Sequence, residues 1–90
     1  MEIKKGENRF YLVDEQKREA GEITWHLFED HVWVIDRTYV SSDFRGQGIA
    51  GILLDTLADY ARKEDIKLIP MCSYAEKQFK IKKEYQDIIY

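Results

Sequence analysis

The stretch RGQGIAGILL, Arg45–Leu54, places three glycines in front of an apolar run and can be interpreted in two ways. Gly46, Gly48 and Gly51 have the G-x-G-x-x-G spacing of a dinucleotide-binding turn. The same residues fit a second pattern, R-x-x-G-x-A, which runs from Arg45 to Ala50. Both interpretations place a phosphate at the N-terminus of a helix, so the residues on either side of the turn must decide between them.

The surroundings of the turn argue against a dinucleotide site. That site needs a strand leading directly into the first glycine and an acidic residue about 20 residues further on. Here residues 41–45 separate Val40 from Gly46, and the next predicted strand ends in Pro-Met-Cys (70–72), with no acid. A Walker loop is excluded as well, because the turn is not followed by Gly-Lys-Ser or Gly-Lys-Thr.

The second pattern describes a site for a diphosphate. The first backbone N–H groups of a helix have no acceptor inside the helix, and the helix dipole adds positive character there. Gly46 and Gly48 would let a phosphate approach the backbone closely, and Arg45 adds a full positive charge. The alternative is that the glycines only form a turn and that the arginine is a solvated surface residue.

The residues before the turn have the period of strands. Short polar turns separate three segments in which apolar and polar residues alternate: RFYLVD (9–14), AGEITWHLF (20–28) and HVWVIDRTYV (31–40). This pattern predicts an antiparallel meander. Strict alternation along the last segment predicts one face with Val32, Val34, Asp36, Thr38 and Val40, and an opposite face with Trp33, Ile35, Arg37 and Tyr39.

The residues after the turn have the period of a helix. Apolar residues recur at helical spacing over residues 48–64, which predicts a helix about 25 Å long. IKLIPMC (66–72) predicts a short buried strand, and residues 73–90 predict a helical region in two short pieces. The order is β-β-β-β-α-β-α. It predicts an α+β fold with a mixed, mostly antiparallel sheet, a long helix and a short C-terminal helical region, all in a single domain (1–90).

The composition narrows the classes of partner. The chain has 90 residues, a net charge of −3 and well-mixed charges without a basic stripe, so we expect no nucleic acid as a partner. No apolar run approaches the roughly 20 residues that cross a membrane. The first ten residues contain no apolar signal segment, and a single cysteine allows no internal disulfide. We therefore expect a cytoplasmic protein, and we predict no metal site.

The segment Arg45–Ala50 resembles the acetyl-CoA loop of the GCN5-related N-acetyltransferases, whose pattern is Q/R-x-x-G-x-G/A. The order of strands, loop, helix and strand is similar to that family too. Cys-Ser-Tyr-Ala (72–75) resembles the C-x-[Y/F]-A segment of a very small, one-domain branch. The resemblance runs from Val13 to Ile89. It implies a compact fold of this family, acetyl-CoA as co-substrate and transfer of an acetyl group to an unidentified amine.

The resemblance also implies a set of site residues. The loop residues that would hold the diphosphate are Arg45, Gly46, Gln47, Gly48, Ile49 and Ala50. The backbone of the fourth strand would hydrogen-bond the pantetheine arm, which assigns Thr38, Tyr39 and Val40. For those three residues the alternative is plain strand propensity.

The catalytic candidates are Cys72 and Tyr74. The cysteine would precede a helix, whose N-terminus favours a thiolate that could accept the acetyl group. It could equally line the pocket or be a small buried hydrophobic residue. Tyr74 could donate a proton to the leaving CoA thiolate, or belong to the core. Glu22, His26 and Asp36 are further candidate proton carriers, and none of them is assigned as the base.

Two positions depart from the family pattern. Ser73 follows the cysteine where many relatives have proline, and Arg37 precedes Thr38 where many have histidine. Roles tied to those positions are not carried over. The chain also lacks much of the C-terminal part that shapes an acceptor pocket in typical members. The alternative function is therefore a non-catalytic module that binds or senses CoA. A third is an interaction domain that has lost its ligand, which the intact Arg45–Ala50 loop disfavours.

Overall fold

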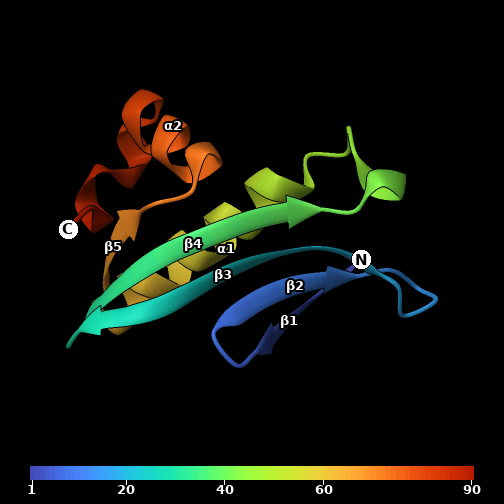
Figure 1. Ribbon diagram of the computed structural model, residues 1–90, viewed down its shortest axis with the longest axis horizontal. Helices are drawn as coiled ribbons and strands as arrows, with labels where there is room; N and C mark the ends of the chain where they lie inside the picture. Colours follow the sequence, from blue (N-terminus) through green and yellow to red (C-terminus); the bar gives the residue numbers. More distant parts are fainter.

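Five strands form one sheet in the order β1-β2-β3-β4-β5 in the computed structural model, which describes residues 1–90 (Figure 1). The first four strands pair antiparallel and the fifth pairs parallel to β4: β1 (Glu2–Gly6), β2 (Arg9–Val13), β3 (Glu19–Glu29), β4 (Val32–Val40) and β5 (Lys67–Pro70). The helices are η1 (Ser42–Phe44), α1 (Ile49–Glu64), α2 (Ser73–Ile81) and η2 (Lys83–Ile88), where η marks a 3-10 helix. The predicted α+β fold and its mostly antiparallel mixed sheet are confirmed.

The long connection between β4 and β5 is α1, which lies behind the sheet in Figure 1. A parallel pair of strands needs such a crossover, and the helix covers the apolar face of the sheet. Sequence periodicity placed the helix correctly to within one residue at its N-terminus. The first strand, β1, has no bounds in the sequence-based prediction, because its polar residues form an exposed edge strand with little apolar alternation.

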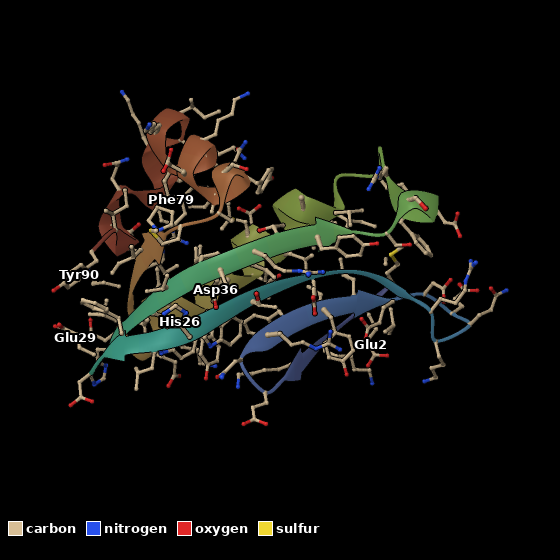
Figure 2. All side chains as sticks on the ribbon, viewed as in Figure 1. Glu2, His26, Glu29, Asp36, Phe79 and Tyr90 are labelled. Carbon is tan, nitrogen blue, oxygen red and sulfur yellow. The ribbon has the colours of Figure 1, made fainter.

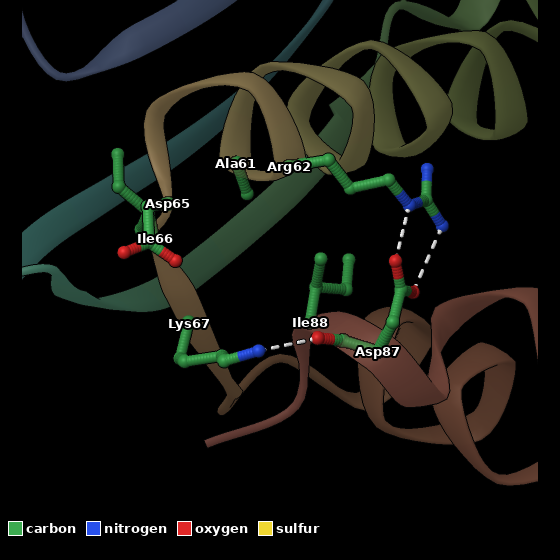
Figure 3. Close-up of a pocket in the computed structure, with 7 residues that line it drawn as sticks. All are labelled: Ala61, Arg62, Asp65, Ile66, Lys67, Asp87 and Ile88. Carbon is green, nitrogen blue, oxygen red and sulfur yellow. Dashed lines mark hydrogen bonds and ion pairs between the residues drawn. The ribbon is translucent and has the colours of Figure 1, made fainter.

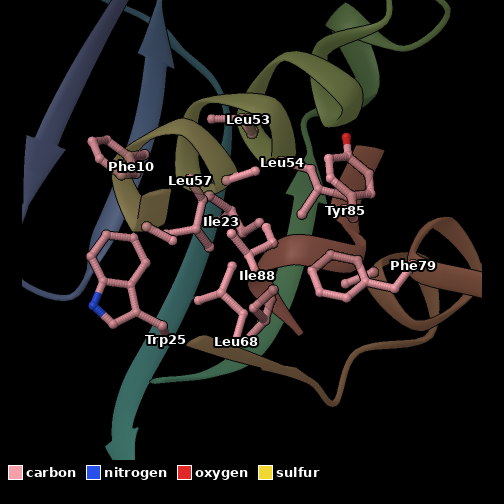
Figure 4. Packing of buried hydrophobic residues seen from close by; sticks show 14 of the residues in the cluster. Phe10, Ile23, Trp25, Leu53, Leu54, Leu57, Leu68, Phe79, Tyr85 and Ile88 are labelled. Carbon is pink, nitrogen blue, oxygen red and sulfur yellow. The ribbon is translucent and has the colours of Figure 1, made fainter. Parts of the chain in front are cut away.

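The core lies between α1 and the sheet (Figure 4). Buried side chains on one stripe of α1, with Leu53, Leu54 and Leu57 at its centre, pack against β2, β3 and β4. The indole rings of Trp25 and Trp33 stack at a centroid distance of 4.7 Å and extend this core toward the C-terminal end of α1. Each fully buried leucine contributes about 1.5–3 kcal/mol relative to an exposed one.

The C-terminal region is packed onto the same core. Phe79 of α2 and Tyr85 of η2 are both buried in it and lie 5.2 Å apart between ring centroids. Two polar contacts tie η2 to α1: the Tyr85 hydroxyl donates to the carboxylate of Asp55, and Arg62 Nε donates to Asp87 at 2.7 Å. The two helical pieces predicted for residues 73–90 are confirmed as α2 and η2.

A β-bulge interrupts β4. Trp25 of β3 pairs with Ile35. The neighbouring pair is Thr24 with Arg37, so one residue of β4, Asp36, is left without a partner on β3. An extra residue of this kind reverses the alternation of the side chains that follow it. Strict alternation along this strand, which the sequence analysis assumed, is therefore wrong beyond Ile35.

The bulge turns the end of β4 toward the core. Thr38 pairs with Ile23, a fully buried residue of the core, and Val40 packs against the same core. Both residues therefore lie on the face that α1 covers, together with Ile35. The predicted grouping of Thr38 and Val40 with Val34 on one face is therefore wrong. Alternation alone could not reveal the bulge that moves them to the other face.

A stability test follows from Gly51, in the first turn of α1. A Cβ atom at this position would meet only the Tyr74 hydroxyl, at 3.7 Å, which is an ordinary van der Waals contact. Gly51→Ala should raise the free energy of unfolding by about 0.5–1 kcal/mol, because alanine loses less conformational entropy in a helix. Chemical denaturation measures the change, and Ala50→Gly should lower stability by a similar amount. A less stable Gly51→Ala variant would show that α2 cannot accommodate the methyl group.

Candidate functional site

The glycine turn presents open backbone at the start of α1. Gly48 is the N-cap of the helix, and both Gly46 (φ 83°) and Gly48 (φ 72°) adopt left-handed backbone conformations that other residues rarely tolerate. A Cβ atom at either position would have no protein atom within 4 Å. The first N–H groups of this 16-residue helix have no acceptor within it, so they are available to an anion.

Neighbouring residues hold the turn in place. Phe44 of η1 is buried, and its N–H donates to the carbonyl of Ser41 at 2.9 Å. Arg45 is exposed, forms no ion pair with an acidic side chain, and directs its Nε toward the carbonyl of Val40 at 3.5 Å. A buried aromatic anchor thus fixes the loop, while a cationic side chain at its surface is free to bind an anion.

The second part of the candidate site is the open edge of β4. Strand β5 pairs with β4 only from Val32 to Ile35, and the last contact is the N–H of Met71 donating to the carbonyl of Ile35 at 3.1 Å. Beyond this point β4 continues to Val40 while the chain after β5 turns away into α2 (Figure 1). Residues 38–40 therefore have no strand partner on this side, and the backbone groups of that edge can bond a ligand.

Cys72 lies at this divergence of β4 and β5. It is the N-cap of α2, and its sulfur accepts a hydrogen bond from the N–H of Ala75 at 3.4 Å. The Thr38 hydroxyl lies 3.5 Å from the same sulfur, so the end of β4 and the start of α2 meet through these two side chains. The predicted position of the cysteine before a helix is confirmed, whereas its contact with the Thr38 side chain was not anticipated.

Tyr74 reaches from α2 to the first turns of α1. Its hydroxyl lies near Gly51, at van der Waals distance from the place that a Cβ atom there would occupy. Burial raises the pKa of Tyr74, and the nearby side chains of Asp55 and Cys72 add to the effect. Burial and the bond to Asp55 also raise the pKa of Tyr85 well above its usual range. Both phenols therefore stay protonated at neutral pH, so Tyr74 can act as a hydrogen-bond donor.

Asp55 was missed by the sequence analysis. In the sequence it lies outside the apolar stripe of α1, a position that is typical of a solvated side chain on an amphipathic helix. In the structure its carboxylate accepts from Tyr85 and lies close enough to Tyr74 to influence its pKa. No local signal could have shown this, because the two tyrosines come from the C-terminal region of the chain.

The other candidate proton carriers lie away from Cys72. His26 Nδ1 lies 2.7 Å from a carboxylate oxygen of Asp36 on the exposed face of the sheet (Figure 2). Glu22 pairs with Arg9 at 2.5 Å and with Arg37 at 3.3 Å on that same face. The bulge places Thr38 on the opposite face. Tyr74 lies close enough to Cys72 for the two side chains to interact electrostatically, whereas Glu22, His26 and Asp36 bond to other residues on the exposed face of the sheet.

A cavity of about 250 Å³ lies at the far end of α1 (Figure 3), with the lining residues Ala61, Arg62, Asp65, Ile66, Lys67, Asp87 and Ile88. Its charged groups bind one another: Arg62 pairs with Asp87, and Lys67 Nζ donates to the Asp87 carbonyl at 2.6 Å. These bonds anchor the C-terminal region, and the cavity is separated from the glycine turn by the length of the helix. Two further cavities lie beside Met1 and the turn before β3, so none adjoins Cys72.

No group of three or more His, Cys, Asp or Glu side chains is arranged to hold a metal ion. None of the helices combines the length and the apolar composition that a membrane-crossing segment requires.

Comparisons of the sequence and of the structure with known proteins point to the same family. The model of the family described as GCN5-related N-acetyl-transferase matches residues 9–88. A GCN5-like protein of Staphylococcus aureus, solved by NMR, is 36% identical with a TM-score of 0.82, and the match covers 99% of this chain and 87% of that one. No curated protein matches the chain in sequence.

Two larger proteins share the fold over about half of their own length. The ribosomal-protein-alanine N-acetyltransferase of Brucella melitensis is 26% identical with a TM-score of 0.65, and the match covers 80% of this chain and 57% of that one. Rv2747 of Mycobacterium tuberculosis, solved in complex with CoA, is 15% identical with a TM-score of 0.63, and the match covers 89% and 56%. The second of these shows the fold alone.

Proposed function

Because the chain belongs to the GCN5-related N-acetyltransferase family, we propose that it binds acetyl-CoA and transfers the acetyl group to an amine. The observation that carries this proposal is the glycine turn. Gly46 and Gly48 leave open space over the backbone at the N-terminus of α1. The open edge of β4 begins beside it, and Cys72 lies further along that edge.

In this proposal the diphosphate, the pantetheine arm and the thioester of acetyl-CoA each have a place. The diphosphate binds the N–H groups of residues 45–50, with Arg45 supplying positive charge. The pantetheine arm runs along residues 38–40 and takes the backbone bonds that a further strand would take. The thioester then lies where β4 and β5 diverge, next to Cys72 and Tyr74. These placements follow from the open backbone groups and from the family resemblance together.

The proposed chemistry passes through Cys72. Its thiolate attacks the carbonyl carbon of the thioester, the bond from that carbon to the CoA sulfur breaks, and an S-acetyl cysteine forms. CoA leaves as a thiolate that takes a proton from Tyr74. The amine then attacks the acetyl carbon, the thiolate of Cys72 is released, and the proton lost by the amine returns to the tyrosine through solvent. The net change is acetyl-CoA plus amine giving an amide and CoA.

The alternative is a module that binds CoA without catalysis. None of the cavities adjoins Cys72, so the structure offers no enclosed pocket for an acceptor. The chain also spans only about half the length of the larger acetyltransferases that it matches. A binding module would retain the glycine turn and the affinity for CoA, and would release no CoA when amines are supplied.

Ligand binding is the first part of the test. Acetyl-CoA at 100 times its Kd should stabilise the folded protein by about 2.7 kcal/mol, because it binds only the folded state. In a domain of this size that raises Tm by roughly 10 °C or more. NAD is the matched control, since it also carries adenosine and a diphosphate but has no pantetheine. Stabilisation by NAD and none by acetyl-CoA would contradict the choice of ligand.

Acetyl transfer is the second part. Polyamines, lysine peptides and small amines are supplied one at a time with acetyl-CoA, and free CoA is followed with a thiol reagent. An enzyme should release CoA faster with at least one of these amines than by hydrolysis alone. Tight binding of acetyl-CoA without any amine-dependent release of CoA would favour the binding module over the enzyme.

A further inference from the structure

The Cys72 sulfur has a second hydrogen-bonding partner that comes from a different part of the fold. The Thr38 hydroxyl lies 3.5 Å from it, within the range of hydrogen bonds to sulfur, and both residues are partly buried. Thr38 belongs to β4 and Cys72 caps the N-terminus of α2, and the two lie 34 positions apart in the chain. This contact closes the far end of the open β4 edge.

The bulge in β4 is what directs Thr38 toward the cysteine. With strict alternation Thr38 would lie on the same face as Val34, away from α1. Because Asp36 is left unpaired, the threonine instead pairs with the buried Ile23 and lies on the face toward α1. Bulges commonly redirect a side chain in this way at functional sites. The side chain of a β-branched residue is also restricted at χ1, which limits where the hydroxyl can point.

We propose that Thr38 is a positioning residue for Cys72. The Thr38 hydroxyl donates to the sulfur and holds the sulfur toward the open edge of β4. This inference rests on the proposed function, which assigns only the backbone of Thr38 to the pantetheine arm. It adds a role for the side chain of the same residue. Together with the N–H of Ala75, the hydroxyl gives the sulfur two donors from two elements. Two donors favour a charged sulfur over a neutral one.

Two other titratable groups, Tyr74 and Asp55, face the region around Cys72 and must be considered in the test. Tyr74 of α2 is protonated at neutral pH and carries no charge. Asp55 of α1 carries a carboxylate that accepts from Tyr85 and lies close enough to Tyr74 to raise its pKa. Thr38→Val replaces neither of these side chains, so a change in the alkylation of Cys72 is assigned to the loss of the Thr38 hydroxyl.

The test is the rate of alkylation of the ligand-free protein by iodoacetamide. Cys72 is the only cysteine, so all of the reaction reports on it. Thr38→Val removes the hydroxyl and retains the shape, whereas Thr38→Ser retains the hydroxyl. The valine variant should react about 3- to 10-fold more slowly at neutral pH, since it lacks one hydrogen bond to the thiolate. Its half-maximal rate should also move to higher pH, while the serine variant stays close to the wild type.

Two outcomes would overturn the inference. One is a pH profile of Thr38→Val that superimposes on the wild type. The other is an equal loss in Thr38→Val and Thr38→Ser, which would assign the effect to packing. Circular dichroism checks that both variants fold. Because no acetyl-CoA is present, a failure of acetyl-CoA binding would contradict only the proposed function, and an unchanged profile would contradict only this inference.

Discussion

Replacing Cys72 with serine is expected to lower the rate of acetyl transfer by more than about 100-fold while acetyl-CoA still binds. A hydroxyl at this position cannot supply the thiolate that attacks the thioester. Serine does retain an N-cap for α2, because its oxygen can accept from the N–H of Ala75 as the sulfur does. The loss of activity would therefore be chemical and not a consequence of unfolding.

Alanine at the same position separates the two roles of the side chain. Cys72→Ala removes the cap as well as the nucleophile, so it should cost about 1 kcal/mol of stability that the serine variant retains. Transfer is followed by release of CoA in the presence of an active amine. Mass spectrometry after brief exposure to acetyl-CoA should find an acetyl group on the peptide that contains Cys72 in the wild type. A mild loss of activity without this acetyl group would show that the amine attacks acetyl-CoA directly.

Gly48→Val should weaken acetyl-CoA binding by about 10- to 100-fold. The valine side chain would fill the open space over the N-terminus of α1, where the diphosphate is proposed to approach the backbone. No protein atom lies within 4 Å of the new Cβ, so the cost to folding comes only from the left-handed backbone at this position. That cost is about 1–2 kcal/mol and is paid with or without ligand. Isothermal titration calorimetry measures the affinity.

Asp65→Val is the matched control for this experiment. Asp65 is the C-cap of the same helix and also has a left-handed backbone, with φ 58°. Valine there should destabilise the fold in the same manner, but at the opposite end of α1 from the glycine turn. Its affinity for acetyl-CoA should equal that of the wild type. If Gly48→Val binds as tightly as this control, the diphosphate does not lie over the turn.

Local patterns in the sequence determined the elements that carry the candidate site. The helix over residues 49–64 follows from apolar spacing, and the glycine loop that precedes it marks its start. Alternation predicted β2, β3 and β4 and their antiparallel order. These signals depend on residues that are neighbours in the chain, so they can be interpreted without knowing the fold. The turn at Gly46 and Gly48 was recognisable for the same reason.

Tertiary structure alone decided which side chains meet. The bulge at Asp36 depends on the register of β4 against β3, and it reverses the direction of Thr38 without any local signal. The contact between Thr38 and Cys72 joins residues 34 positions apart, and Asp55 meets Tyr85 across 30 positions. Such contacts form because the sheet, α1 and the C-terminal region bury one common core. The sequence alone therefore placed Cys72 before a helix and the glycine turn at the start of α1, whereas the partners of the cysteine and of Asp55 depended on how those elements pack.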